Sequence, residues 1–275
     1  MRRPRLLIAL GIVVMGLITY WQTRSVNPVT GKVQHIALTT DQEIALGLQS
    51  APGMAQQFGG LDPDDRAQAF VTALGTKLVR STVASSTPYQ FSFHVLADDA
   101  TVNAFALPGG PVFITHALLA RLENEAQVAG VLGHEIGHVI GRHSAQQIAK
   151  SNLAESLVRA IGVAASDDQG NGRGAAALAG AIAQMVQMKY GRQDELESDT
   201  IGVKLMSDSG YDPRAMVRVM DILREATGGG QRQPEFMSTH PDPGNRQELI
   251  EATIEKLFPG GVPSNLTLGQ VFQGS

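Results

Sequence analysis

The sequence predicts an α+β fold that is mainly helical and contains a small sheet of about three strands. One observation is composition: aromatic residues make up 5% of the chain and there are 30 glycines, and this abundance of small residues favours packed helices. A second is periodicity, because apolar residues recur at helical spacing in most segments and alternate in only a few short ones. Hydrophobic residues account for 43% and charged residues for 17%, so the chain can form a core and is not mainly disordered.

Charge and cysteine content exclude several classes of protein. The 22 basic and 26 acidic side chains give a formal net charge of −4 without a block of like charge, which is not typical of a nucleic-acid-binding protein. We therefore expect no nucleic-acid partner. The chain contains no cysteine, which excludes a disulfide framework, thiolate metal ligands and a cysteine nucleophile.

Residues 1–24 predict a segment apart from the fold, either a membrane anchor or a signal sequence. Arginines in the first turn precede an apolar run from Leu6 to Trp21. The positive-inside rule places the N-terminus in the cytoplasm and the remaining chain across the membrane. In a bacterium, residues 25–275 would lie on the periplasmic side of the inner membrane, or in the periplasm if the segment is cleaved.

The first half of the remaining chain predicts two helices followed by the sheet. Thr40 with Glu43 resembles a capping box that opens a helix to about residue 57, and Asp62-Pro63 opens the next helix. Apolar and polar residues alternate over 89–95, which predicts a half-buried strand. Two further strands are expected at Asn103–Leu107 and Val112–Thr115, and one strand of the sheet would be an exposed edge.

The second half predicts helices. Asn124 and Gln127 resemble a capping box that opens a long helix through about Lys150. An Ala-rich helix is expected over 175–188, and a further helix runs from about Arg192 to Ser209. The Gly228–Gly230 run predicts a mobile loop ahead of His240.

The motif His134-Glu135-Ile136-Gly137-His138 lies inside the long predicted helix. On a helix, two histidines at i and i+4 point the same way and can hold one metal ion. Neutral imidazoles suit zinc, and Glu135 lies beside the pair, where it can take a proton from a water molecule that the metal activates. A chance match is the alternative, but each unpaired polar group on a buried helix costs about 1–3 kcal/mol. We therefore expect one Zn²⁺ ion per chain.

A catalytic zinc ion needs a third protein ligand and an open position. His143 lies about 140° around a continuous helix from His138, so we reject it as a ligand and expect a partly exposed histidine on the helix face. Glu195 and Asp199 lie one turn apart on one face of a later helix. We expect Glu195 to bind the metal and Asp199 to accept a hydrogen bond from a ligand imidazole. Glu197 is roughly 200° from Glu195 and points away. A solvated acidic helix face is the alternative for this segment.

These motifs together resemble a known family. The segment GHEIGHVIGRHS, the ExExD pattern at Glu195–Asp199 and Ser238-Thr239-His240-Pro241 are similar in order and spacing to the HtpX/CAAX-prenyl-endopeptidase family of gluzincin zinc metallopeptidases, and closest to its periplasmic BepA/LoiP-like branch. The resemblance covers residues 27–258, and Ser198 stands where the family's commoner pattern has alanine.

The resemblance implies a zincin-type metallopeptidase domain with the sheet beside the active-site helix. It implies that His134, His138 and Glu195 are the zinc ligands and that Glu135 is the catalytic base. It also places His240 on a loop that can approach the metal, where it would stabilise the oxyanion or serve as a removable fourth ligand. A surface histidine in a proline-rich turn is the alternative for His240. Arg246 matches a family arginine whose role the sequence does not reveal.

We therefore predict a zinc-dependent endopeptidase that cleaves unfolded or misassembled envelope proteins in periplasmic quality control. Substrate would bind in extended form along the edge strand, because backbone pairing accepts any unfolded chain. The strand consists of Asn103, Ala104, Phe105, Ala106 and Leu107. A periplasmic chaperone or assembly factor with latent protease activity is the alternative. A structural zinc site is disfavoured, because such sites close with four Cys or His ligands. The endopeptidase requires Glu195 beside the imidazole pair and an opening for a peptide.

Overall fold

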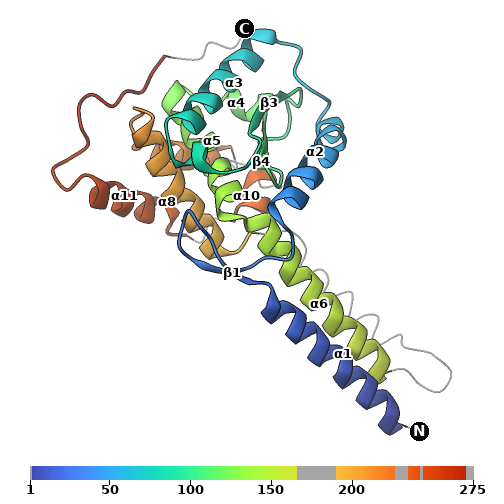
Figure 1. The fold of residues 1–275 in the computed structure, drawn as a ribbon. Coiled ribbons are helices and arrows are strands. Elements are labelled where there is room, and N and C mark those ends of the chain that lie inside the picture. The colour runs from blue at the N-terminus through green and yellow to red at the C-terminus, as the bar shows by residue number, and fades with distance from the viewer. Residues whose placement is uncertain (1, 166–189, 227–234, 242–243, 271–275) are drawn as a thin grey trace. The chain divides into compact units, whose positions relative to one another are not determined.

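The fold is that of a computed structural model of the chain, which describes residues 2–165, 190–226, 235–241 and 244–270 (Figure 1). The chain divides into two compact units, which are described separately. The N-terminal unit comprises Met1–Thr39 and Ser144–Lys189, and the core unit comprises Thr40–His143 and Tyr190–Ser275. The predicted class is confirmed, because the described residues are mainly helical and the core unit holds a three-stranded sheet.

The sheet of the core unit has the strand order β3-β5-β4. Strand β3 (Ser92–Leu96) is parallel to β5 (Pro111–Thr115), and β4 (Ala104–Ala106) is antiparallel to β5. The turn between β4 and β5 uses Gly109 and Gly110, whose φ angles of 78° and 133° favour glycine. Strand β4 therefore lies at an edge of the described sheet, as the sequence predicted for one of its strands.

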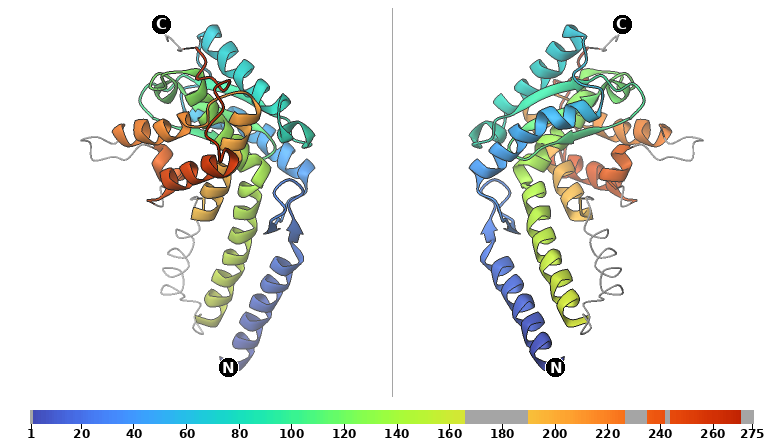
Figure 2. Two further views of the ribbon diagram at one scale, coloured as in Figure 1. Left: turned by 90° about the vertical axis from the view of Figure 1, so that its left-hand side faces the viewer. Right: turned by 90° about the vertical axis from the view of Figure 1, so that its right-hand side faces the viewer.

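Helices cover both faces of this sheet. Helix α3 (Asp65–Arg80) begins at the N-cap Asp64 and packs its buried apolar stripe on β3, where a Cβ at Gly75 would overlap the ring of Phe93. Helix α2 (Thr40–Gln57) covers the other face and lies in front of the sheet in the right-hand view of Figure 2. Its Ala55 packs against Leu96 and Phe113.

Helices α5 (Glu125–Gly141) and α8 (Arg192–Asp208) form the centre of the core unit. Helix α5 begins where Asn124 accepts a hydrogen bond from the backbone of Gln127, and it is buried along almost its whole length. The two backbones meet at glycine: a Cβ on Gly133 would lie 3.3 Å from Cα of Gly202, and one on Gly137 would lie 2.9 Å from Cα of Ser198. Small residues therefore set the spacing of these two helices.

The predicted helix through Lys150 is wrong, because α5 ends at Gly141 and a new helix, α6 (His143–Ala165), follows. Arg142 separates them in the left-handed conformation, with φ of 58°. Its guanidinium donates from Nε to Glu43 Oε2 at 3.0 Å, and its Nη2 lies 2.9 Å from the same oxygen. A tertiary ion pair thus holds an arginine in a conformation that is usually left to glycine, and no local sequence pattern announces it.

The remaining elements of the core unit surround this pair of helices. The short helix α4 (His116–Leu119) follows β5, and η1 (Val83–Ser86) follows α3. Helix α9 (Ala215–Glu225) packs on α5, and α11 (Arg246–Leu257) packs on α8. Helix α10 (Glu235–Thr239) meets the start of the edge-strand segment, where the Phe236 N–H donates to Val102. The predicted helix over 175–188 and the predicted loop at Gly228–Gly230 lie outside the described residues.

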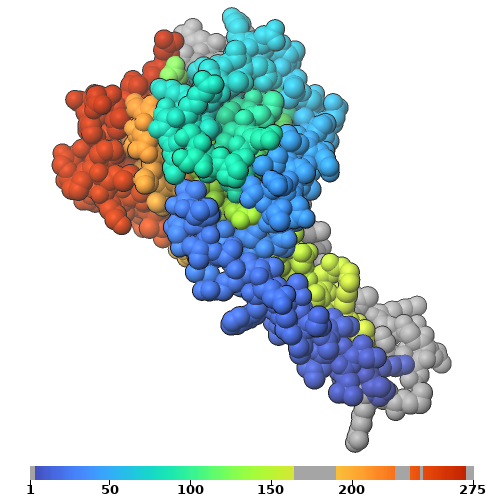
Figure 3. All heavy atoms as spheres, viewed as in Figure 1, coloured from blue at the N-terminus to red at the C-terminus, as the bar shows by residue number. Residues whose placement is uncertain are grey.

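The N-terminal unit contains α1 (Arg2–Gln22), a hairpin of β1 (Arg24–Val26) and β2 (Val33–His35), and nearly all of α6. Within α1, Pro4–Gln22 is long and apolar enough, by length and composition, to cross a membrane. Its large apolar side chains are exposed, among them Leu7 and Trp21, and the helix is the blue rod of Figure 3. The domain boundary after residue 24 stays a prediction.

Candidate metal centre

Helix α5 turns three polar side chains into the interior of the core unit. His134 and His138 are each 2% exposed, and Glu135 is fully buried. The two imidazoles lie one turn apart, and their Nε2 atoms are 3.0 Å from each other. The helix therefore presents both rings to one point, as the i, i+4 spacing predicted.

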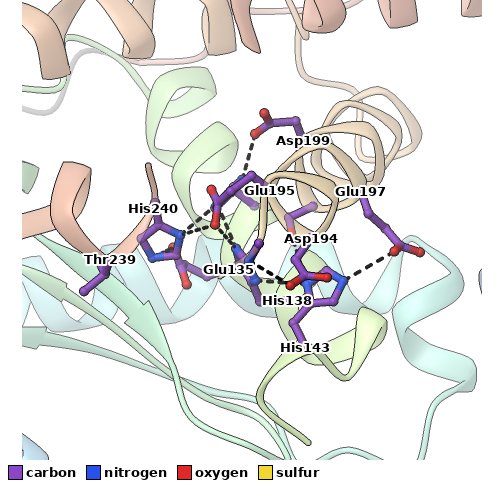
Figure 4. A network of polar contacts seen from close by, with 12 residues as sticks. Glu135, His138, His143, Asp194, Glu195, Glu197, Asp199, Thr239 and His240 are labelled. Carbon is purple, nitrogen blue, oxygen red and sulfur yellow. Dashed lines mark hydrogen bonds and ion pairs between the residues drawn. The ribbon is translucent and has the colours of Figure 1, made fainter. Parts of the chain in front are cut away.

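Two further helices bring ligand atoms to the same point (Figure 4). Glu195 of α8 places Oε2 3.4 Å from His134 Nε2 and Oε1 3.5 Å from His138 Nε2. His240, which follows α10, places Nδ1 3.3 Å from His134 Nε2 and 3.2 Å from Glu195 Oε1. These four residues form a cluster whose ligand atoms all lie within 4.8 Å of one another. We call it the four-ligand cluster.

The cluster matches the dimensions of a tetrahedral metal site. Ligand atoms at about 2.0–2.1 Å from a zinc ion, in a tetrahedron, are about 3.3–3.4 Å from each other. Among the three proposed ligands on the helices, the separations run from 3.0 Å, between the two imidazole Nε2 atoms, to 3.5 Å, between His138 Nε2 and Glu195 Oε1. Three imidazole nitrogens and a carboxylate are also a ligand set that suits zinc.

Hydrogen bonding within the described residues also fits a cation at this point. Both carboxylate oxygens of Glu135, Oε2 of Glu195 and Nε2 of His240 are buried without a hydrogen-bond partner there. Buried polar atoms are nearly always paired, so this gathering of acceptors calls for an explanation. A cation bound between these atoms would explain why they lack hydrogen-bond partners.

The outer nitrogen of His134 is held by an ion pair. His134 Nδ1 donates to Asp199 Oδ1 at 2.8 Å, which leaves the lone pair on Nε2 for the cluster. Arg246 of α11 donates to the same carboxylate from Nε at 2.8 Å and from Nη2 at 2.7 Å. Its Nη1 also lies 3.3 Å from Glu195 Oε2. Arg246, whose role the sequence did not reveal, is a fully buried counter-charge to two carboxylates.

The outer nitrogen of His138 meets His143, and here one expectation is wrong. His143 is fully buried, not partly exposed, because the helix is interrupted at the left-handed Arg142 and the angle along one continuous helix does not apply. His143 Nδ1 lies 3.0 Å from His138 Nδ1, and His143 Nε2 lies 3.4 Å from Glu197 Oε2. His143 remains outside the four-ligand cluster. Glu197 points away from the cluster, as predicted, toward His143 (Figure 4).

Burial and neighbouring charges shift the pKa values of the groups at the site in different directions, and a metal ion must displace any proton held on a ligand nitrogen. Burial raises the pKa of Glu135, which suits a group that must accept a proton. Burial alone would raise the pKa of Glu195, but the imidazoles of His240 and His134 lower it, so the carboxylate is ionised. Burial also lowers the pKa of His138 and keeps its ring neutral. Burial opposes a charge on His134, yet hydrogen bonds with Asp199 and Glu195 raise its pKa to about 9.

His240 closes the cluster in this structure. Its ring is fully buried and stacks on Phe236 with centroids 4.5 Å apart. Its Nε2 lies 3.6 Å from Glu135 Oε1, so the ring also contacts the predicted base. The expectation of a surface histidine in a proline-rich turn is wrong, because the short helix α10 carries the ring inward. An endopeptidase requires an opening that admits a peptide to the metal centre. Among the described residues, no such opening is present while His240 is in this position.

The predicted substrate strand lies at the free edge of the sheet. The backbone of Asn103 accepts from Thr115 and that of Leu107 donates to Pro111, so the alternate residues Ala104 and Ala106 turn their backbone groups away from β5. The side chain of Asn103 is buried, and its Oδ1 has no hydrogen-bond partner in the described parts of the chain. Phe105 packs on Phe58 of the segment after α2.

Tyr190 is a second neighbour of the cluster that the sequence analysis did not single out. Its ring stacks on His138 with centroids 4.0 Å apart, directly before the N-cap of α8. The one signal for it is its place next to the helix that carries Glu195. The signal for His143 was its closeness in sequence to the motif. That signal was misinterpreted, because the angle of one continuous helix was applied to a residue beyond the end of α5.

Comparisons with known proteins agree with this arrangement. The pattern of peptidase family M48 matches residues 65–254. The chain is 32% identical over 200 residues to the beta-barrel assembly-enhancing protease of Escherichia coli, covering 71% of this chain and 40% of that protein. Its counterpart in Yersinia pestis is 30% identical over 87% of this chain and 49% of its own length.

A mitochondrial relative is similar over a shorter stretch. The mitochondrial metalloendopeptidase OMA1 of Arabidopsis thaliana is 32% identical over 57% of this chain and 30% of its own length. The chain thus spans less than half the length of these curated relatives.

Proposed function

Because the chain belongs to peptidase family M48, we propose that it is a metal-dependent endopeptidase that binds one Zn²⁺ ion per chain. His134, His138 and Glu195 are the proposed ligands, and Glu135 is the proposed general base. The convergence of these side chains from α5 and α8, at separations typical of a tetrahedral zinc site, is the observation that carries the proposal.

Glu135 performs the proton transfers in the proposed mechanism. Bound zinc would supply a Lewis acid that polarises the scissile carbonyl and makes water more acidic. Glu135 takes the proton of the attacking water and passes it to the leaving amine. Its raised pKa places the carboxyl nearer to the working pH, where it can both accept and release a proton. Asp199 orients the His134 ring through the Nδ1 hydrogen bond.

His240 acts as a removable fourth ligand in this proposal. Its Nδ1 lies 3.3 Å from His134 Nε2 and 3.2 Å from Glu195 Oε1, and in this proposal it occupies the position that water and substrate need. Displacement of His240 would open that position to water and substrate; stabilisation of the oxyanion is the alternative role for this ring. The enzyme is therefore latent when His240 is in place.

Unfolded or misfolded envelope proteins are the proposed substrates. The printed names of the bacterial relatives refer to β-barrel assembly, and the edge strand can pair with an extended chain regardless of its sequence. The apolar helix at Pro4–Gln22 supports a location on the periplasmic side of the bacterial inner membrane, or in the periplasm if it is cleaved as a signal sequence.

The variant Glu135→Gln tests the base. We expect zinc content near that of the wild type and cleavage of casein at least about 100-fold slower, because the acceptor carboxylate is lost. Glu251→Gln, at an exposed position of α11, is the matched control and should cleave normally. Retained cleavage in Glu135→Gln would contradict the assignment. Client recovery in cells that is equal for the variant and the wild type would instead favour a chaperone.

The pair Glu195→Ala and Glu197→Ala tests the third ligand. Glu195→Ala should lose zinc, because only two helix ligands and His240 remain. Glu197→Ala should still reach a stoichiometry near one at saturating zinc, since its carboxylate is directed at His143. The opposite pattern, measured by metal analysis of the purified full chain, would exchange the two roles.

A further inference from the structure

We infer that His143 is a positioning residue for the metal centre, which holds the ring of His138 and is itself held by Glu197. The inference rests on the proposed function, since it concerns a ligand of the proposed zinc site. It adds a second outer support to the cluster, on the side opposite the ion pair that holds His134.

The chain is shaped to deliver the His143 ring to this place. Arg142 adopts the left-handed conformation and ends α5, and the ring of the next residue, His143, lies against the last turn of that helix. Gly141 leaves room for the ring: a Cβ there would lie 2.4 Å from His143 Nε2 and 2.6 Å from its Cε1. His143 is fully buried as a result. A buried imidazole at such a turn must find partners for both ring nitrogens.

The direction of the hydrogen bonds follows from the metal site. His138 points Nε2 into the four-ligand cluster, so metal binding requires its proton to be on Nδ1. That Nδ1 lies 3.0 Å from His143 Nδ1, which must therefore accept the hydrogen bond. The proton of His143 is then on Nε2, where Glu197 Oε2 lies 3.4 Å away as the acceptor. Ser198 Oγ, at 3.3 Å, is a second and more distant neighbour of His143 Nδ1.

This arrangement does for His138 what Asp199 does for His134. It selects the tautomer that leaves Nε2 free and fixes the angle of the ring toward the cluster. Without an acceptor, the Nδ1–H of His138 would be a buried donor with no partner, and the ring would be free to rotate away. We therefore expect His143 to raise the affinity for the metal, without touching the metal or the substrate.

Zinc affinity of the full-length chain, measured by competition with a chelator, tests the inference. His143→Leu should bind zinc about 10–100-fold more weakly, the usual effect of removing such a partner. His143→Asn should recover most of the affinity, because the asparagine Oδ1 stands near the place of Nδ1 and accepts the same hydrogen bond. The control His116→Leu removes a histidine outside the cluster, on α4, and should bind like the wild type.

The absorption bands of bound cobalt(II) report on the metal site. They therefore distinguish a change in the metal site from a general loss of packing. The wild type and His143→Asn should show similar d–d bands, and His143→Leu should show altered ones. If His143→Leu does not fold, the milder pair Glu197→Ala and Glu197→Gln decides the question. Glu197→Ala should lose roughly threefold to tenfold in zinc affinity, and Glu197→Gln, which keeps an oxygen acceptor, should lose less.

The outcomes separate the inference from the proposed function. Equal affinity in the wild type, His143→Leu and Glu197→Ala overturns the inference alone, as does an equal loss in His143→Leu and His143→Asn. A wild-type chain that binds no zinc at all overturns the proposed function itself. Tight zinc binding by the wild type, weak binding by His143→Leu and recovery in His143→Asn support the inference.

Discussion

The two imidazoles of α5 are supported in different ways, although they face the same cluster. His134 is held by a charged pair that comes from two remote segments, Asp199 of α8 and Arg246 of α11. His138 is held by His143, which the chain supplies itself at the end of the same helix. The first support depends on tertiary packing of three helices, and the second depends on one turn. The difference predicts how each side fails.

The largest effect is expected from breaking the charged side with Arg246→Met. The substitution leaves the carboxylates of Asp199 and Glu195 buried without their counter-charge, so unfolding should become easier by about 3–5 kcal/mol. Chemical denaturation of the zinc-free protein measures this. The control Arg218→Met removes solvent-exposed ion pairs, which contribute little to stability, and should therefore change the free energy of unfolding far less. Similar losses in both variants would contradict the special weight of the charged side.

A second prediction separates charge from position on the same side. Asp199→Asn keeps an oxygen near the His134 Nδ1–H but removes the charge that pairs with Arg246. Zinc affinity should fall by about 100-fold, the upper end of the range expected for His143→Leu, because the neutral amide is a weaker acceptor and leaves Arg246 poorly compensated. Chelator competition measures both variants. A smaller loss than in His143→Leu would mean that the local turn is the stronger support.

Gly141→Ala tests the local side through the backbone alone. The new methyl group would collide with the His143 ring and move it away from His138. Zinc affinity should fall by about tenfold, in line with the loss of an outer partner. The free energy of unfolding of the zinc-free protein should change less than the zinc affinity does. Alanine is the better helix former by about 1 kcal/mol, which offsets part of the strain. Normal zinc affinity, with the fold intact, would show that the ring position does not matter.

The smallest effect concerns the pair that shapes the turn, Glu43 and Arg142. Burial raises the pKa of Glu43 more than Arg142 lowers it, so the native state keeps the proton to higher pH than the unfolded chain does. The free energy of unfolding therefore falls as the pH rises from the unfolded value, about 4, through the raised one. Glu43→Gln does not titrate. The wild type should lose stability relative to this variant over that window, as urea unfolding at a series of pH values would show. A constant gap would contradict the raised pKa.

Sequence patterns predicted most elements of the core unit, because their signals are local. The strands lie close to the segments where polarity alternates, and α8 ends beside Gly210 as expected. The meeting of His134, His138 and Glu195 at one point was also predicted, since helical periodicity fixes which residues share a face. Their roles as ligands await metal analysis.

What the sequence did not predict depends on contacts between distant segments. The break at Arg142 is held by Glu43, a residue of a different helix, and nothing near Arg142 signals it. The error at His143 follows from that break, because an angle computed along one helix has no meaning across two. Arg246 shows the same limit, since its charge is paired only after α11 packs on α8.

Gly133 against Gly202, and Gly137 against Ser198, bring the backbones of α5 and α8 into contact beneath the ligands. The reach between His134 and Glu195 is thus set by main chain, which is far stiffer than long side chains. Because the ligands on α5 and α8 are preorganised, neither helix needs to move when a metal ion binds. The rates at which the metal ion binds and dissociates should then be limited by the displacement of His240. Both rates should be low while the His240 ring occupies the cluster.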